Sequence, residues 1–333
     1  MKTKFLKSSL ATLAVISTLW SPAAQAQKVM RIQDYPGLGN FLVRVANANG
    51  LCEKNGIKCE LRPLVSSPLG LQTLMAGDLE VAFVSSDSLI QATNKGADLK
   101  VIGSGSRDPV FFMMAAAGLS MPNAAKGYPA VMQDFKGKKI GITARGSGAE
   151  FVLKDMLLDA GMKLDDVIMV AVGAPNTAFP AIANKQIDAL VLFTPMDGFC
   201  EVAKACTVVV DPRKGQGPAD IIKSRGASML QVIRGDYAAK NAESVEAFSK
   251  VMREAEVIAQ NPANFSAMLK IASDTFKIAT EGGDKVLEIS LRNTMPGLRF
   301  AADAQALQHV AQYNFKNGQI DKVVDTSKLL YAR

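Results

Sequence analysis

The chain has 333 residues, of which 48% are hydrophobic and 6% aromatic, and 38 basic against 31 acidic residues give it a net charge of +7. This length allows one large domain or two of ordinary size, and the aliphatic content excludes a disordered chain. A single histidine, His309, excludes a multi-histidine metal centre and leaves one candidate partner for a serine or cysteine nucleophile.

Residues 1–26 have the pattern of a secretory signal peptide. Three lysines within the first seven residues precede an apolar run at 10–20, and Ala-Gln-Ala at 24–26 fits the small-x-small cleavage pattern. The run is shorter than the roughly 20 apolar residues of a membrane span, and no cysteine follows it to carry a lipid. Because cleavage removes three lysines, 35 basic residues would remain against 31 acidic ones, a net charge of +4. We therefore expect export to the periplasm.

Short apolar runs and amphipathic stretches alternate in the first third of the mature chain. The runs at 29–33, 59–64, 81–84 and 99–103 predict strands, and the stretches at 41–49, 70–75 and 88–94 predict helices. Residues 85–87, Ser-Ser-Asp, are of the types that cap a helix N-terminus, and Gly77 suits the end of the preceding helix.

The same alternation continues to residue 235. Strands are predicted at 110–117, 139–143, 166–172, 187–193 and 229–234, and helices at 150–160 and 177–184. The chain is mostly helical from 242 and ends in a long helix at 303–314. Alternating strands and helices imply an α/β fold with largely parallel sheets. Two such blocks predict two lobes with crossings near 105–108 and 234–236, so that 27–106 and 236–333 form the first lobe and 107–235 the second.

The four cysteines form two local pairs, Cys52 with Cys59 and Cys200 with Cys206. In an exported chain such pairs predict two short-range disulfides, with free buried thiols as the alternative. Neither pair has the CxxC spacing of a zinc knuckle or a redox motif, so we expect structural bridges and no metal.

Four stretches carry a family resemblance: LGLQTLMAGDLEVAFV (69–84), KGADLKVIG (95–103), DFKGKKIGITARGSGAEFVLKDMLLDAG (134–161) and AIANKQIDALVLFTP (181–195). Together they resemble the ABC-transporter substrate-binding proteins of the nitrate, sulfonate, taurine and bicarbonate type, a group that also includes pyrimidine-precursor binders. The resemblance covers most of residues 30–235, while the C-terminal third matches only in helical character.

The resemblance implies a type II periplasmic-binding-protein fold. Each of its two lobes would be a mixed, mostly parallel sheet flanked by helices, and two segments would form the hinge. Such a protein is a receptor and not an enzyme, and it needs no cofactor. It closes over a small molecule between the lobes and delivers it to the membrane permease of an ABC importer.

The turn Arg145-Gly146-Ser147-Gly148 is the strongest candidate binding element. It follows a predicted strand and precedes a predicted helix, where N–H groups and a hydroxyl attract an anion and glycines allow close approach. The turn matches the family's Gly-Ser turn, which the resemblance implies binds ligand oxygens. An ordinary turn with Ser147 as helix cap is the alternative.

Two further candidates lie in the loop after the first strand, which the resemblance implies is a wall of the pocket. There, Tyr35 could stack on or hydrogen-bond the ligand, and Asn40 could donate a hydrogen bond; a bland turn is the alternative. The other candidates at the ends of strands are Ser67, Ser86, Asn176 and Phe193. Helix capping for the polar three and core packing for the phenylalanine are the alternatives.

Arg107, at the expected hinge, and Arg145 are the cations best placed to bind a carboxylate or sulfonate through two hydrogen bonds. A surface ion pair is the alternative for each. We therefore expect an anionic cargo of sulfonate, nitrate or carboxylate type.

Three other functions remain open at this stage. A receptor of a TRAP-type transporter can share this fold and address. An enzyme related to the thiamine-pyrimidine synthases would need clustered cysteines, a suitable histidine and no signal peptide. A nucleic-acid binder would need a basic tract, and the basic residues are spread along the chain. We expect no nucleic-acid partner and a monomer.

Overall fold

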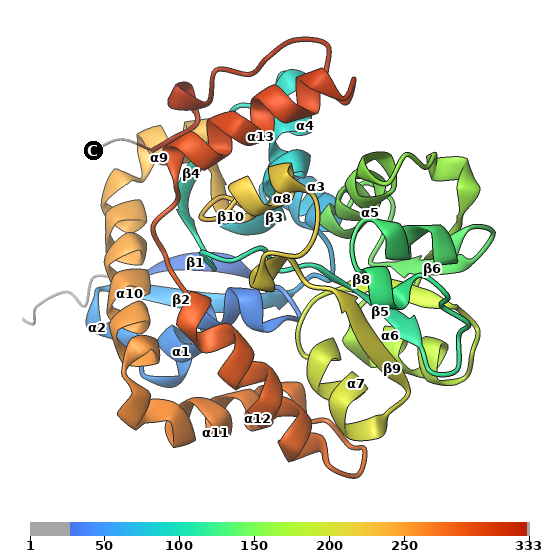
Figure 1. Ribbon diagram of the computed structural model, residues 1–333. Coiled ribbons are helices and arrows are strands. Elements are labelled where there is room, and N and C mark those ends of the chain that lie inside the picture. The colour runs from blue at the N-terminus through green and yellow to red at the C-terminus, as the bar shows by residue number, and fades with distance from the viewer. Residues whose placement is uncertain (1–26, 332–333) are drawn as a thin grey trace, which may run out of the picture.

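The computed structural model describes residues 27–331, so the expected signal peptide lies outside the described residues. The strands form two layers that lie side by side, each covered by helices (Figure 1). The first layer joins a two-stranded and a three-stranded sheet through a β-bridge and is treated below as one sheet, and the second layer is a five-stranded sheet. The first contains β1 (Lys28–Asp34), β2 (Ile57–Pro63), β3 (Ala82–Ser85), β4 (Leu99–Ser104) and β10 (Met229–Arg234). The second contains β5 (Phe112–Ala116), β6 (Lys139–Ile142), β7 (Ile168–Ala171), β8 (Ala189–Leu192) and β9 (Cys206–Val210).

In chain order the helices are α1 (Phe41–Ala48), α2 (Leu51–Lys54), α3 (Ser67–Ala76), α4 (Ser86–Asn94), α5 (Gly148–Asp159), α6 (Pro175–Ala183), α7 (Met196–Ala203), α8 (Ala219–Lys223), α9 (Gly235–Lys240), α10 (Ala242–Gln260), α11 (Phe265–Phe276), α12 (Gly283–Thr294) and α13 (Ala304–Lys316). Helices pack on both faces of the first-lobe sheet, and α4 of the first lobe contacts α5 of the second. Gly77, in the left-handed conformation, ends α3, and the Ser85 side chain caps α4, as the sequence predicts.

The two sheets have the same strand order. The second runs β7-β6-β8-β5-β9, with β6 parallel to β7 and β8, and β5 antiparallel to β8 and β9. In the first, β10 lies antiparallel between β3 and β4, and a parallel bridge from Ile32 to Val81 connects them to the parallel pair β1 and β2. In each sheet the antiparallel strand is the one that enters from the other lobe. This repeated topology confirms the predicted α/β fold of two lobes.

The expected position of the second crossing needs a correction. The predicted boundaries place residues 229–234 in the second lobe, but these residues form β10, which pairs with β3 and β4 in the first sheet. The chain therefore returns to the first lobe before Met229, between β9 and β10. An apolar run shows that a strand forms but does not show which sheet it joins, because pairing is a long-range contact. The remaining lobe boundaries stay a proposal.

The two crossing segments, which we call the hinge segments 105–111 and 211–228, contact each other. Gly226 N donates to Arg107 O at 2.6 Å, and Arg225 Nη2 lies 2.6 Å from Asp108 Oδ1. Each lobe therefore meets the other through paired backbone segments, an arrangement in which small dihedral changes can move one lobe against the other.

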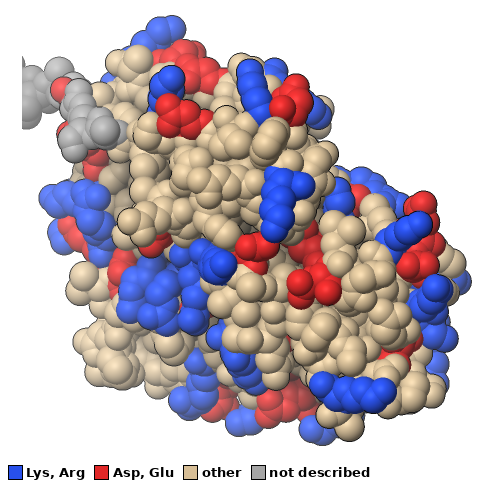
Figure 2. All heavy atoms as spheres, turned by 45° about the horizontal axis from the view of Figure 1, so that its top comes forward, with Lys and Arg blue, Asp and Glu red and all other residues tan. Residues whose placement is uncertain are grey.

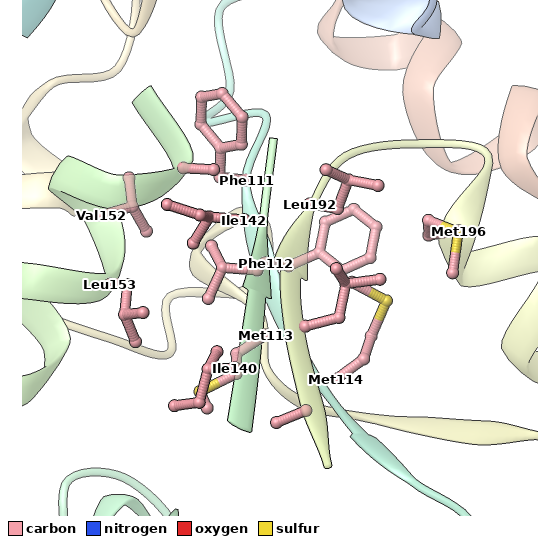
Figure 3. Close-up of a cluster of buried hydrophobic side chains, with 14 of the residues drawn as sticks. Phe111, Phe112, Met113, Met114, Ile140, Ile142, Val152, Leu153, Leu192 and Met196 are labelled. Carbon is pink, nitrogen blue, oxygen red and sulfur yellow. The ribbon is translucent and has the colours of Figure 1, made fainter. Parts of the chain in front are cut away.

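The core of the second lobe forms around β5. Phe112, Met113 and Met114 are fully buried there and pack with Ile140 and Ile142 of β6 (Figure 3). The two methionines are therefore core residues. In the first lobe α1 packs on α10, and α13 packs on α4.

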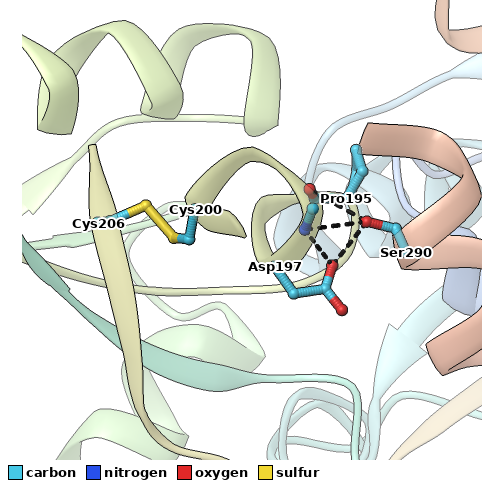
Figure 4. Close-up of a disulfide and its surroundings, with 6 residues drawn as sticks. Pro195, Asp197, Cys200, Cys206 and Ser290 are labelled. Carbon is cyan, nitrogen blue, oxygen red and sulfur yellow. Dashed lines mark hydrogen bonds between the residues drawn. A yellow bond between two sulfur atoms is a disulfide. The ribbon is translucent and has the colours of Figure 1, made fainter. Parts of the chain in front are cut away.

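Helix α12 contacts both lobes. It contributes Val286 to the core that contains β5 and Leu287 and Leu291 to the core that contains α1. Its Ser290 Oγ donates to Asp197 Oδ1 at 2.7 Å, at the start of α7 (Figure 4). The C-terminal helices thus connect the lobes independently of the hinge segments.

Both predicted disulfides are present. Cys52–Cys59 joins α2 to β2, and Cys200–Cys206 joins the end of α7 to β9 (Figure 4). They link residues seven and six positions apart, so each closes a short loop.

Replacing both cysteines of either pair by serine is expected to lower the free energy of unfolding by about 2–3 kcal/mol, because the unfolded chain regains loop entropy. The urea midpoint of each double variant, compared with that of the oxidised protein, measures this loss. Reductant should lower the urea midpoint of the parent. It should leave the midpoint unchanged in a variant in which all four cysteines are replaced by serine. Equal midpoints for parent and double variants would contradict a stabilising role.

Candidate functional site

Four aromatic side chains meet where the lobes touch, and we call them the aromatic cluster: Tyr35, Phe83, Phe111 and Phe193. The Tyr35 ring lies 5.6 Å from that of Phe83 in the first lobe and 4.9 Å from that of Phe193 in the second, measured between centroids. The Phe111 and Phe193 rings are 5.9 Å apart. All four are at least 98% buried, so the lobes close over an apolar contact.

The loop after β1 reaches this contact because it contains Gly37. A Cβ at this position would lie 2.5 Å from Phe193 Cδ2, so a larger residue would push the loop away from the second lobe. The loop that contains Tyr35 therefore lies against the second lobe.

Two buried hydroxyl groups meet at this interface. Tyr35 Oη comes from the first lobe, and Thr143 Oγ1 directly follows β6 in the second. Burial raises the pKa of Tyr35 well above its ordinary value, and a hydrogen bond with the Thr143 side chain acts in the opposite direction. Among residues 27–331 neither hydroxyl has another hydrogen-bond partner, so the pair uses only part of its hydrogen-bonding capacity and can also bond a third molecule.

The predicted glycine-serine turn also lies at the interface. Ser88 Oγ of α4 donates to Gly146 O at 3.1 Å, across the two lobes. Gly148 begins α5, and a Cβ there would lie 2.6 Å from Phe111 Cε2 and 2.8 Å from Ser85 Cβ. The buried Ser147 occupies the N-cap position but makes no cap bond, and its Oγ accepts from Ala144 N at 3.4 Å. The turn therefore brings the first turns of α4 and α5 together.

The two predicted arginines do not point into this interface. Arg145 is 61% exposed, with Nη1 3.4 Å from Glu150 Oε1, and Arg107 is 53% exposed, with Nε 3.4 Å from Asp108 Oδ1. Each forms the surface ion pair given above as the alternative. Figure 2 likewise shows basic and acidic side chains close together over much of one face. The arginines therefore add no support for an anionic ligand.

The predicted polar residues lie in three places: the interface, the interior of the first lobe and the exposed surface of the second. Asn40 is buried, and its Nδ2 donates to Gln33 O at 2.8 Å, so its donor is used within the lobe. Ser67 Oγ accepts from Ser85 N at 3.0 Å, which also positions the start of α4. Asn176 is exposed on α6, and Ser86 lines a cavity between the lobes.

Two small cavities remain between the lobes. Ser86, Phe111 and Gly148 line the first, and Gly39, Thr194 and Arg213 line the second, among other residues. The space open to water centres is about 20 Å³ in each, enough for a water molecule but not for a solute. The structure therefore shows the lobes closed against each other.

Several residues of the interface were not among the sequence candidates: Phe83, Ser88, Phe111 and Thr143. Phe83 and Thr143 lie in the last two residues of predicted strands, and strand ends are where ligands bind in such sheets. That signal was available for both. Ser88 and Phe111 reach the site only because the lobes meet.

A two-lobe α/β body with hydroxyl groups and aromatic rings between its lobes is typical of proteins that close over a small molecule. Solved structures agree on the fold. The alkanesulfonate-binding protein of Xanthomonas axonopodis pv. citri, bound to MOPS, superposes with a TM-score of 0.73 at 17% identity over 91% of this chain and 98% of that one. The periplasmic nitrate-binding protein of Synechocystis PCC 6803 gives 0.69 at 13% identity, over 92% and 86%. The fold is therefore that of the periplasmic binding proteins.

The chain belongs to the NMT1/THI5-like family, whose profile matches residues 41–264. A relative from Brucella abortus, named a binding protein, is 29% identical over 230 residues, which are 69% of this chain and 65% of that protein. This chain thus spans less than two thirds of the relative's length. The names of these proteins describe binding and not catalysis, in agreement with the predicted receptor class. Within residues 27–331, no helix has the length and apolar character needed to cross a membrane.

Proposed function

We propose that this protein is a periplasmic solute receptor of an ABC importer. Residues 1–26 direct its export. The protein acts as a monomer that captures a small solute between its lobes and then, in the closed form, delivers the solute to a membrane permease. One observation carries the binding step: the Tyr35 and Thr143 hydroxyls, from opposite lobes, meet in a buried position beside aromatic rings, with hydrogen-bonding capacity that no other described residue uses. A solute that bonds both hydroxyls would favour the closed form, because only that form brings them together.

The comparisons support the solute class without deciding it. The structural neighbours are named for alkanesulfonate and nitrate, and the Brucella relative is named only as a binding protein. A sulfonate, nitrate or carboxylate is therefore the first class to test, with Gly148 N, at the start of α5, as a donor, because Gly146 N and Ser147 N already donate to Glu150 Oε2 and Ala144 O. The aromatic cluster favours a solute with a flat or apolar part. A TRAP-type receptor remains the alternative for the partner.

A thermal-shift screen of the mature chain against sulfonates, nitrate, aromatic carboxylates and pyrimidines tests this function. A solute present at 100 times its dissociation constant should stabilise the protein by about 2.7 kcal/mol. A flat response to all four classes would contradict the proposal.

Tyr35→Phe is then expected to weaken binding of the solute found by about tenfold, because it removes one hydrogen bond and keeps the ring. Isothermal titration calorimetry measures the change. The matched control is Tyr128→Phe, since the Tyr128 hydroxyl bonds Asp159 away from the interface, and its affinity should equal that of the parent. Equal affinity of the Tyr35 variant and the parent would remove Tyr35 from the site.

A further inference from the structure

Carboxyl groups from both lobes face one cavity. Asp87 on α4 and Asp155 on α5 line the first interlobe cavity, and Asp220 on α8, within the second hinge segment, lines it as well. Asp155 is only 4% exposed. Closure of the lobes therefore brings acidic groups together that a separation of the lobes would return to water.

The surroundings of this cavity contain more acceptors than donors. Asn314 Nδ2 donates to Asp87 Oδ1 at 2.9 Å, and Gln319 Nε2 donates to Asp155 Oδ1 at 3.4 Å. The remaining oxygens of these two amides, Asn314 Oδ1 and Gln319 Oε1, are buried without a partner, and Asn314 is fully buried. The Tyr313 hydroxyl, in the cavity lining, donates to Asp155, and this bond lowers the pKa of Asp155 against the larger effect of burial. The two unpartnered amide oxygens still lack a donor, and a proton on a carboxyl group would supply one.

The charged groups around the cavity do not neutralise the pair. The charged side chains in its described lining are the three aspartates. Lys154, next to Asp155 on α5, favours the charged carboxylate, whereas Asp87 and Asp220 disfavour it. His309 on α13 lies 3.0 Å from Asp220 and not at the pair. Within residues 27–331, no group of three acids, cysteines or histidines is placed to hold a metal ion.

We propose that closure of the lobes takes up a proton, which Asp87 and Asp155 hold at the interface, so that acid favours the closed form and alkali favours the open form. This switch rests on the lobe closure of the proposed function and not on the identity of the solute. The proton comes from water and bonds to a carboxylate oxygen, and no other bond changes.

The direction of the effect follows from the shifted group. Burial, and then the charge of Asp87, raise the pKa of Asp155 from 3.8 to about 8 in the closed form. Burial also raises the pKa of Asp87, and its bond from Asn314 opposes this. Between pH 3.8 and about 8 the closed form thus binds more protons than an open form with an ordinary aspartate. The ratio of closed to open molecules therefore falls as pH rises through this range, by on the order of 100-fold between about pH 5.5 and about pH 9.

Distances between spin labels on the two lobes of the ligand-free protein test the switch. Lys95→Cys and Lys163→Cys place labels at exposed positions after α4 and after α5. We expect the short interlobe distance to dominate at about pH 5.5 and a longer one at about pH 9. Asp155→Asn, a neutral side chain of the same size, should keep the short distance at both pH values.

Asp165→Asn is the matched control, because it makes the same charge change at an exposed residue of the second lobe. It should respond to pH as the parent does. If circular dichroism shows that Asp155→Asn does not fold, Asp87→Asn takes its place; it removes only the charge that adds to the effect of burial, so the opening of the lobes should move to lower pH without disappearing. An unchanged distance in the parent between the two pH values, an Asp155→Asn variant that still responds, or an Asp87→Asn variant that opens at the same pH as the parent would overturn the switch.

Repeating the measurement at fixed pH with sodium, ammonium or tetramethylammonium chloride separates a proton from a bound cation. We expect the three salts to give the same distance, and closure by sodium or ammonium alone would overturn the proton assignment. Because no solute is present, a loss of the pH response refutes the switch alone. A failed solute screen refutes the receptor function alone.

Discussion

Gly148→Ala is expected to keep the lobes from closing and to weaken solute binding by about 10- to 100-fold, which corresponds to the roughly 1–3 kcal/mol cost of crowding a packed contact. The added methyl group would meet Phe111 at 2.6 Å and Ser85, across the interface, at 2.8 Å. Neither neighbour can move away freely, because Phe111 packs on Phe193 and Ser85 is the N-cap residue of α4. The interlobe label distance and calorimetry with the solute from the screen measure the two effects.

Gly141→Ala is the matched control for this variant. It crowds Ile187 and Leu190 at 2.7 and 2.8 Å inside the second lobe, away from the interface. It should lower the stability of that lobe and leave the closed distance unchanged. If both alanine variants lost affinity equally, the effect of Gly148→Ala would come from a damaged lobe and not from a blocked closure.

Asp197→Ala is expected to lower the free energy of unfolding by about 3–5 kcal/mol, because it leaves a buried charge without one of its partners. Asp197 is 5% exposed, and its carboxylate lies 3.0 Å from Arg213 Nη1. The Nε atom of the same arginine pairs with Asp211. Asp197 also accepts from Ser290 at 2.7 Å and from Asn293 at 3.0 Å, both on α12. The substitution thus loosens the attachment of α12 to the second lobe as well, and the urea midpoint measures the combined loss.

Asp236→Ala is the control for removing an aspartate from an ion pair. Its carboxylate is 58% exposed and lies 3.0 Å from Arg234 Nε. Such exposed pairs contribute at most about 1 kcal/mol. A loss from Asp197→Ala no larger than this control would show that the contact between α12 and α7 does not hold the structure together.

The local elements were largely predictable, since their signals lie within a few residues. The apolar runs at 29–33 and 139–143 became β1 and β6, and the Ser-Ser-Asp cluster became the cap of α4. β9 was not predicted, although its Thr-Val-Val-Val run, directly after Cys206, is rich in β-branched residues. The pairing of β10 with β3 and β4 had no local signal at all.

The candidate site was predictable only in part. Tyr35, Phe193 and the glycine-serine turn lie at the interface, as their positions at strand ends indicated. Arg107 and Arg145 do not lie at the interface. Each is a flexible charged side chain that pairs with a carboxylate no more than five positions away in the chain, Asp108 and Glu150 respectively. A sequence pattern cannot show this preference when both the interface and the neighbour are available.

The sequence by itself determined the α/β class, the two local disulfides and the family that the four quoted stretches resemble. These features depend on residue type and on contacts between near neighbours in the chain. Removal of residues 1–26, which the sequence predicts, would lower the net charge from +7 to +4, which no longer favours a polyanionic partner. Only the tertiary structure decided that the hydroxyls of Tyr35 and Thr143 meet across the lobes and that Asp87 and Asp155 share a cavity. The reason is physical: a side chain's partners, its burial and its proton affinity depend on groups far away in the sequence, and these meet only when the lobes close.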